Sequence, residues 1–416
     1  MRSRSRVLHP RVLLVLALLD PSAVRGQALT LEEVQQQTLL HHPQVIAAQK
    51  TWEAAQAQRS GVRLPPDPQL SLEYEGLPGI LDLGQYGERN LELSQVLEYP
   101  GKPRFRGRLA EYQAQLAGLD YEFLRLEIRA EASAACGRLW AARDLLAQAS
   151  ESQRLAEDFR DKTQRRVAAG DASPLEALRA EVEAGRAVAE SAVAANQVQL
   201  ALAILNTLLG RTPEAALEVS GELEYLPLKA ELHTLQQRAL EQRADLRAAA
   251  IRAESARAGQ GLARAGLLPD LELSAGRQHI RQEGPFWRAG FALALPLWST
   301  TGQRGALASA RAETAGAEAL QTGRKNQALL EIQEAYLGVR TAEIRLLLYR
   351  DRVLPGAEEG YQIARRRYDE GTSSYLEVLD AGRALAEARL TLVQALLDHH
   401  LAFTMLTRAV GGNLTE

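Results

Sequence analysis

The sequence contains the same succession of segments twice, at an offset of about 200 residues. Three pairs of segments match in the same order and at nearly the same spacing: 64–71 with 267–274, 169–176 with 370–377, and 205–210 with 406–411. Chance could produce one such pair, but three in order indicate a duplicated unit. Because the offset far exceeds the roughly 20–50 residues of a solenoid repeat, each copy is one large unit.

Each copy predicts the same order of elements. A first helix ends before a Pro-Asp turn, where proline cannot continue a helix. Two short strands, a very long helix, a glycine break and a second long helix follow. The helices are expected at 31–62, 104–169 and 173–209, and again at 232–265, 303–370 and 374–410. We therefore divide the chain into a first repeat (29–210), a connector in the equatorial region (211–231) and a second repeat (232–416).

Apolar residues in the long helices recur at alternating steps of three and four, as in Leu116, Leu119, Phe123 and Leu126. This spacing is typical of a coiled-coil seam. A helix of about 65 residues is roughly 100 Å long, so it cannot hide its seam inside a small globule. The fold class predicted is mainly α with a small β part, in which long coiled-coil helices lie against one another.

Period-two alternation identifies two strands in each copy, and thus four per chain. In the first strand, Leu70 and Leu72 alternate with polar residues. This pattern places one face against an apolar phase and the other against water or a small-residue interior, and runs of ~10 residues match outer-membrane strands. A half-buried soluble sheet would alternate in the same way. In a membrane, Trp287 and Phe291 would lie on the lipid-facing side of the sheet. An aromatic belt nearer the membrane–water interface would contain Tyr74, Tyr86, Tyr99 and Trp298.

The N-terminus predicts a signal peptide over residues 1–28. A basic leader precedes an apolar run at 12–19, which is long enough for a signal-peptide core and too short to span a bilayer. The alternative is a buried N-terminal helix. Small residues at Ala23, Gly26 and Ala28 would suit cleavage. No other segment has ~18 consecutive apolar residues, so we expect no membrane helix.

Composition excludes several classes of function. The formal net charge is −3, so no basic field attracts nucleic acid. Cys136 is the only cysteine, which excludes disulfides and cysteine-based zinc sites within the chain. The adjacent histidines at 41–42 and 399–400 point about 100° apart on a helix, so neither pair suits a metal. We expect no metal site, no cofactor, no catalytic residues and no enzyme activity.

Four strands are too few to form a membrane barrel alone. Single-chain outer-membrane barrels begin at about eight strands, and an open sheet edge cannot stand in lipid. If these strands enter a membrane, several copies must share one barrel. Two copies would give eight strands and a plugged interior, whereas three would give twelve and an open bore. Oligomerisation therefore follows from the strand count.

Several motifs resemble the outer-membrane factor (TolC-like) family, and most closely its heavy-metal efflux branch. The motifs are Pro43 after a histidine pair, the Pro-Asp turns before the strands, the segment Ser-Gln-Val-Leu-Glu-Tyr-Pro-Gly-Lys at 94–102, and the segment 367–381. The segment 367–381 is the most specific of them. The resemblance covers nearly all of the mature chain. It implies a homotrimer with a twelve-stranded barrel in the outer membrane, a periplasmic tunnel of helices, a periplasmic adaptor protein and an inner-membrane transporter of the RND type.

The function implied is that of an outer-membrane channel subunit in a tripartite efflux system. The substrate would pass from the periplasm to the exterior, and the resemblance would suit heavy-metal cations as that substrate. Two alternatives remain: a periplasmic coiled-coil scaffold that does not enter the membrane, and the outer-membrane duct of a type I secretion system.

The glycine breaks mark the tips of the long helical hairpins, which the resemblance places at the adaptor and the periplasmic gate. Gly170 and Gly371 stand where the chain must reverse, and glycine tolerates the left-handed conformation that ends a helix. Beyond Gly371, Glu377 and Asp380 are three residues apart and share a helix face. The resemblance assigns them to an acidic ring at the closed end of the tunnel.

The resemblance also assigns a gate latch to Tyr368, just before the tip glycine. The basic partner that the family has beyond the glycine is absent, because Ser373 stands there. The first repeat has Val167 in place of the tyrosine and Arg179 in place of Asp380. Only the second repeat is therefore expected to form the gate.

Overall fold

The computed structural model describes residues 28–295, 302, 304–412 and 414. Residues 1–27, which hold all but the last residue of the predicted signal peptide, lie outside the described part of the chain, and so does Trp298. In chain order the elements are α1 (Leu31–His41), α2 (Pro43–Gln58), β1 (Gln69–Glu75), β2 (Glu88–Leu97), α3 (Gly101–Ala169), α4 (Pro174–Leu208), α5 (Leu232–Gln242), α6 (Ala244–Ala265), β3 (Leu271–Ile280), β4 (Gly284–Leu293), α7 (Arg304–Leu348), the π-helical turn η2 (Tyr349–Val353), α8 (Leu354–Asp369) and α9 (Tyr375–Val410).

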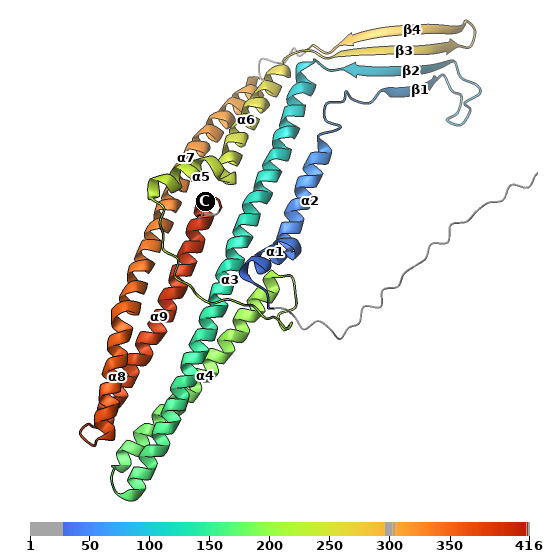
Figure 1. Ribbon diagram of the computed structural model, residues 1–416. Helices are drawn as coiled ribbons and strands as arrows, with labels where there is room; N and C mark the ends of the chain where they lie inside the picture. The colour runs from blue at the N-terminus through green and yellow to red at the C-terminus, as the bar shows by residue number, and fades with distance from the viewer. Residues whose placement is uncertain (1–27, 296–301, 303, 413, 415–416) are drawn as a thin grey trace, which may run out of the picture.

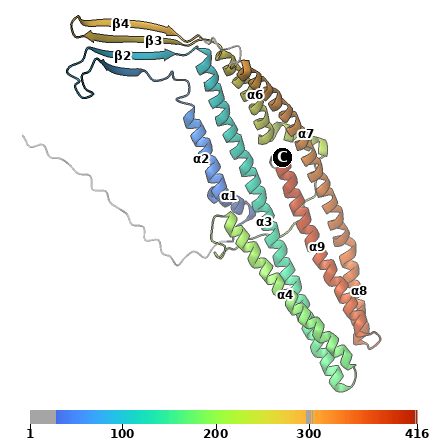
Figure 2. The same ribbon diagram turned by 180° about the vertical axis from the view of Figure 1, so that it is seen from behind.

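The molecule is a long rod of helices with a small sheet at one end and two helical hairpins at the other (Figures 1 and 2). The hairpins are α3 with α4, and α8 with α9. Helices α2 and α6 flank the half of α3 that lies nearer the sheet. The predicted fold class, mainly helical with a small antiparallel sheet, is confirmed.

The four strands form one antiparallel sheet in the order β1-β2-β3-β4. The two repeats therefore contribute adjacent hairpins, and the central pair β2–β3 joins them. Within the described residues, β1 and β4 each have a hydrogen-bonded neighbour on one side only. Both sheet edges are thus open in a single chain.

Both predicted first helices are broken, which corrects the expectation of continuous helices at 31–62 and 232–265. The first break falls at His42, whose ψ of 124° is extended, as the residue before a proline prefers. The second break falls at Arg243 with ψ of 121° and no proline. Arg243 is only 5% exposed and bonds Asp245, Glu331 and the carbonyl oxygen of Ala409. Tertiary contacts, and not a local signal, therefore bend the chain there.

The predicted helix at 303–370 is continuous in direction but contains the π-helical turn η2, between α7 and α8. Pro355 lies just after it. Proline has no N–H and its ring crowds the carbonyl four residues earlier, here that of Asp351. A wider π-helical turn is one way for a helix to absorb such a misfit.

The main core lies midway along the rod, where the connector crosses the helices. Leu139 and Trp140 on α3 pack with Leu205 on α4 and Val219 in the connector. Gly221 has φ of +109°, and a Cβ atom there would lie 2.7 Å from the Trp140 ring. The connector needs glycine at this position for both reasons.

Helix α4 is apolar enough, by length and composition alone, to cross a membrane. Its most apolar 18-residue window has a mean hydropathy of 1.4, and only 11% of that window is buried. In the structure α4 pairs with α3, and the buried side of α4 consists mostly of small residues, among them Ala180, Ala184 and Ala201. Its exposed apolar side therefore needs an explanation from the assembled protein.

Candidate functional site

The predicted tip glycines both end long helices. Gly170 caps α3 with φ of +83°, and its N–H donates to the Val167 carbonyl. Gly371 follows α8 with φ of +75°, and its N–H donates to the Tyr368 carbonyl. Left-handed backbone of this kind favours glycine. Both turns lie at the end of the rod remote from the sheet (Figure 1).

The predicted acidic pair lies in the first turns of α9. The Glu377 side chain is 55% exposed and accepts a hydrogen bond of 2.7 Å from the Ser373 hydroxyl. Arg367 Nη1 lies 4.0 Å from the same carboxylate. Asp380 is also exposed. Both carboxylates thus face away from the chain's own core, and Ser373 orients Glu377 instead of supplying a positive charge.

Tyr368 does not point outward with the acidic pair. It is 8% exposed, its ring centroid lies 5.3 Å from that of Phe159 on α3, and the Arg166 guanidinium carbon lies 4.9 Å above its ring. Phe159 also stacks on Tyr375 at 4.9 Å. We call Phe159, Tyr368 and Tyr375 the tip aromatic cluster. It joins the two hairpins within one chain.

An ion pair crosses between the same hairpins. Arg383 on α9 donates to both carboxylate oxygens of Glu183 on α4, at 2.7 and 3.3 Å. The hydrogen bond to Glu183 raises the pKa of Arg383, and the charge of Asp380 adds to this effect. Burial raises the pKa of the neighbouring Tyr375, with Glu183 contributing. Sequence reasoning missed both Arg383 and Glu183.

At the opposite end, the sheet has one strongly acidic face. Residues that pair directly across neighbouring strands share a face. On the polar face these pairs bring together the glutamates Glu73, Glu75, Glu88, Glu92 and Glu272, with Arg288 as the one cation among the described strand residues of that face. In the described part of the chain, none of these carboxylates forms a salt bridge, and Glu88 accepts one hydrogen bond from Gln278. The opposite face is apolar over most of its length.

The polar face is also the one with small residues. Ser274 pairs with Gly290, and Gly276 pairs with both Glu92 and Arg288. A Cβ atom on Gly276 would lie 2.6 Å from the Leu91 carbonyl oxygen. Glycine at close backbone approaches lets a sheet curve. The acidic face is therefore suited to be the concave interior of a barrel.

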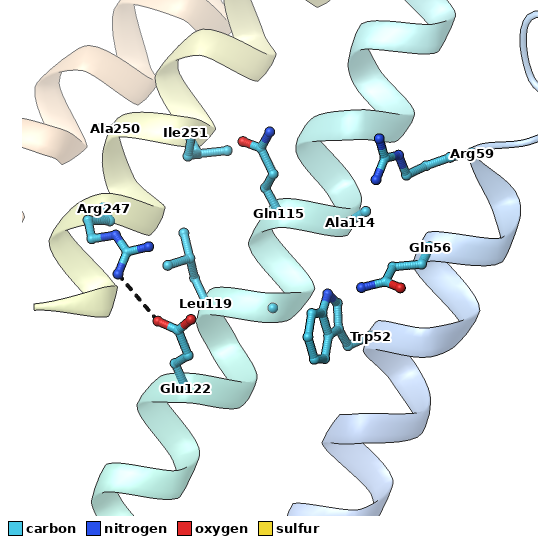
Figure 3. Close-up of a pocket in the computed structure, with 11 residues that line it drawn as sticks. Trp52, Gln56, Arg59, Ala114, Gln115, Leu119, Glu122, Arg247, Ala250 and Ile251 are labelled. Atoms are coloured by element: carbon cyan, nitrogen blue, oxygen red, sulfur yellow. Dashed lines mark hydrogen bonds and ion pairs between the residues drawn. The ribbon is translucent and has the colours of Figure 1, made fainter.

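A groove of about 530 Å³ lies between α2, α3 and α6 (Figure 3), and these helices run together on the part of the rod nearer the sheet (Figure 1). Trp52 packs over Gly118, where a Cβ atom would lie 3.0 Å from the indole nitrogen. On the other side, Arg247 pairs with Glu122 at 3.3 Å, and both are half exposed. Such a pair contributes about 0–1 kcal/mol. The groove is a seam between helices and brings no reactive groups together.

Within the described residues there is no group of three or more histidine, cysteine, aspartate or glutamate side chains placed to hold a metal ion. His399 is buried and His400 partly buried in the helical rod, and desolvation there lowers the pKa of both. Cys136 is buried as well, and burial raises the pKa of its thiol to about 12. The thiol therefore stays protonated and unreactive at neutral pH.

A sheet with one apolar and one acidic face, both edges open, stands on a helical rod too long for a globule. A barrel shared by several copies meets these requirements, with the rod extending into the periplasm. The protein is a subunit of an outer-membrane channel. The outer membrane efflux protein family model matches residues 235–412 of this chain.

Relatives with known names and structures agree with this assignment. The chain is 28% identical over 323 residues to the cobalt-zinc-cadmium resistance protein CzcC of Cupriavidus metallidurans, covering 77% of this chain and 76% of that protein. It is similar in structure to the outer-membrane channel OprN, with a TM-score of 0.78, 23% identity, and coverage of 92% and 90%. It is also similar in structure to the outer membrane protein VceC of Vibrio cholerae, with a TM-score of 0.77 and 24% identity, covering 92% of this chain and 96% of that one.

The resemblance predicted from the motifs is thus confirmed at the level of the family, the fold and the location. The family is one of channel proteins, and this chain is an efflux channel subunit of the outer membrane with its helices in the periplasm. The periplasmic scaffold is set aside. The roles of individual tip residues, and the domain boundaries, stay predictions.

Proposed function

We propose that the protein forms a homotrimeric duct that carries heavy-metal cations from the periplasm to the exterior. It would receive them through a periplasmic adaptor protein from an inner-membrane transporter of the RND type. Members of the family work as trimeric channels with such partners. The duct carries out no chemical reaction on its cargo and needs no cofactor.

The acidic face of the sheet is the observation that supports a cationic cargo. Five glutamates per chain and one arginine, Arg288, share this face in the described strands. If the apolar face meets lipid, the acidic face lines the bore. Rings of carboxylates attract cations into a pore and disfavour anions. The similarity to a cobalt-zinc-cadmium resistance protein points to the same class of cargo.

The open sheet edges support the trimer. Each unpaired backbone group costs several kcal/mol in hydrocarbon, so β1 of one copy must pair with β4 of the next. Three copies give twelve strands. Eight strands, from two copies, leave an interior that side chains fill, which would stop transport.

The tip supplies the gate in this proposal. Three copies of Glu377 and Asp380 would place six carboxylates around the periplasmic entrance. Like charges at short range repel one another and concentrate cations between them. The tip aromatic cluster, which includes Tyr368, holds the two hairpins of each chain together behind this ring. Gly170 and Gly371 form the turns that would touch the adaptor.

The gate is tested by replacing both carboxylates with Glu377→Gln and Asp380→Asn. We expect a higher single-channel conductance in planar bilayers and weaker block by multivalent cations, because six charges leave the constriction. Glu176→Gln is the matched control, since Glu176 holds the position equivalent to Glu377 in the first repeat and should leave both quantities unchanged. Unchanged conductance and block in the double variant would remove the pair from the gate.

The cargo is tested in a strain that has the partner pump but lacks its own outer-membrane channel. Expression of this protein should restore growth in cobalt, zinc or cadmium salts. Glu92→Gln with Glu272→Gln should lower the preference for cations over anions in bilayers. Restored secretion of a protein substrate, with no change in metal tolerance, would favour the type I secretion duct instead.

A further inference from the structure

The apolar face of the sheet is ordered in rows across the strands. From the helical end outward, the directly paired residues are Leu97–Leu271–Leu293, then Gln95–Leu273–Phe291, then Leu70–Leu93–Ala275–Ala289, then Leu72–Leu91–Arg277–Trp287, and last Tyr74–Arg89–His279–Pro285. Basic side chains enter this series only in its last two rows, at the outer end.

The first four rows have the height of a membrane band. From Leu97 to Leu91 the strand advances by roughly 20 Å at 3.4 Å per residue, close to the ~25 Å apolar band of outer-membrane barrels. The row of Tyr74, Arg89 and His279 therefore lies at the boundary of this band, on the side away from the periplasmic helices (Figure 1). It belongs at the level of the outer-leaflet headgroups.

Aromatic contacts hold this row together. Tyr86, in the loop after β1, lies 5.7 Å from the Tyr74 ring and 5.8 Å from the His279 ring, both edge to face. The Arg89 guanidinium carbon lies 5.5 Å from the centroid of the Tyr86 ring. We call Tyr74, Tyr86, Arg89, Arg277 and His279 the outer belt. Its Arg89 side chain is oriented by stacking and not by an ion pair.

The two arginines of the outer belt lack an anion. Both are exposed, and among the described residues neither has a carboxylate within salt-bridge distance. The nearest glutamates in sequence and register, such as Glu88 and Glu92, lie on the opposite face of the sheet. Trp287, paired with Arg277, is 82% exposed on the same face. Two unneutralised guanidinium groups thus stand at the edge of hydrocarbon, where a bare cation is costly.

We propose that the outer belt binds the phosphate of a lipid headgroup in the outer leaflet. A guanidinium group matches phosphate in a bidentate geometry, and exposed aromatic rings beside it suit the boundary between headgroups and acyl chains. The lipid would bring the missing negative charge, and its chains would cover Leu72, Leu91 and Trp287. The site depends on the location in the outer membrane and is independent of the cargo.

The test uses the purified full-length assembly in detergent and diphosphorylated lipid A as the probe, with its dephosphorylated form in parallel. Binding is followed by native mass spectrometry and by the shift of the thermal midpoint. Arg89→Gln with Arg277→Gln should weaken binding of the phosphorylated lipid about 30-fold, since each arginine near an anionic surface contributes a factor of about 5. Arg288→Gln, on the acidic face, is the matched control and should bind as the parent does.

Three results would overturn the proposal: equal binding by the double glutamine variant, equal binding of the dephosphorylated lipid, or equal stabilisation by inorganic phosphate alone. Should the glutamine variant fail to assemble, Arg89→Lys with Arg277→Lys decides the matter. Lysine keeps the charge but loses the bidentate geometry, so binding should weaken by severalfold and still require the phosphate. Unchanged affinity in the lysine variant would contradict recognition by the guanidinium groups.

Discussion

At the scale of the residue, the hydroxyl of Tyr368 is the least expected feature. The ring is packed between Phe159 and the Arg166 guanidinium, yet the buried oxygen has no hydrogen-bond partner in the described part of the chain. A latch formed by this tyrosine within one chain therefore acts through its ring. An unpaired buried hydroxyl costs about 1–3 kcal/mol, so it would be retained for a contact with another subunit or for opening.

This leads to a pair of opposite expectations. Phe159→Ala removes the ring that joins Tyr368 to Tyr375. Because Phe159 is only partly buried, the change costs less than the ~3–5 kcal/mol of a fully buried Phe→Ala change. We expect the two hairpins to separate more easily and single-channel open probability to rise. Tyr368→Phe keeps the packing, so the channel should stay closed and its thermal stability should be unchanged or slightly higher. Opening by Tyr368→Phe would show instead that the hydroxyl bonds a neighbouring subunit.

The tip residues differ in how far a sequence can predict them. Gly170 and Gly371 are visible because a glycine between two long periodic segments is a local signal. Tyr368 and the acidic pair were assigned through the resemblance alone. Phe159 carries no local signal, because it is one apolar residue in a 69-residue helix. Its partners lie more than 200 residues away, and only the packing of one hairpin on the other brings them together.

At the scale of the element, α9 carries two adjacent histidines, of which His399 is buried and His400 is partly buried. His399 contacts the ring of Tyr225 from the connector, and the Glu343 charge on α7 acts on it, with His400 adjacent. His400 lies against α3, where its Nε2 is 3.0 Å from the Ser133 carbonyl oxygen. Burial is the largest cause that lowers the pKa of each, so both are neutral in the folded protein at neutral pH.

The sign of the resulting pH dependence follows from linkage. Because the folded-state pKa of each histidine lies below the unfolded value of about 6.5, the unfolded chain binds more protons as the pH falls. The contribution of these two histidines to the free energy of unfolding is fully present above pH ~6.5, and it is lost as the pH falls through their folded-state pKa values. Glu343 and Asp245, whose lowered pKa values stabilise the fold, lose their contribution only below about pH 4.5.

We therefore expect the temperature of the unfolding midpoint to decrease as the pH is lowered from 7.5 to 5.5. His399→Leu with His400→Gln should flatten this dependence, because both titrating groups are gone. The exposed His233 provides the control, and His233→Gln should leave the curve as it is in the parent. A curve of unchanged slope in the double variant would mean that other groups titrate on unfolding.

The elements themselves were predictable wherever the signal was local. The strands at 69–75 and 88–97 follow the alternation of Leu70, Leu72, Leu91 and Leu93 closely. The bend at Arg243 was not predictable, because the groups that hold it lie on α7 and at the end of α9. Proline at 43 gives the first bend a local cause, and the second repeat reaches the same shape with a buried ion-pair network.

At the scale of the whole molecule, α4 shows how much of the chain is built for contact with other copies. Its exposed apolar residues include Leu178, Val182, Val193, Leu200 and Ile204, from 42% to 72% exposed. At about 100° per residue these five side chains lie within an arc of roughly 80°. The helix therefore has one apolar stripe toward α3, made mostly of alanine, and a second stripe of larger side chains that the single chain leaves uncovered.

The second stripe is too apolar to face water in the assembled protein, and α4 is tied along its length to α3, which ends at a hydrophilic tip. We infer that a helix of the neighbouring subunit covers it, as the open edges of the sheet also require. A charged substitution on the stripe, Val182→Glu with Val193→Glu, should abolish the proposed trimer, which would be followed as a gel band in detergent that disappears on heating. The burial of each valine is worth about 1.5–3 kcal/mol, and a buried unpaired carboxylate adds a larger penalty. Glu190→Gln, an exposed position on the same helix, should leave the trimer intact. A stable trimer in the double glutamate variant would place this stripe outside the subunit interface, and the sheet edges alone would then have to hold the three copies together.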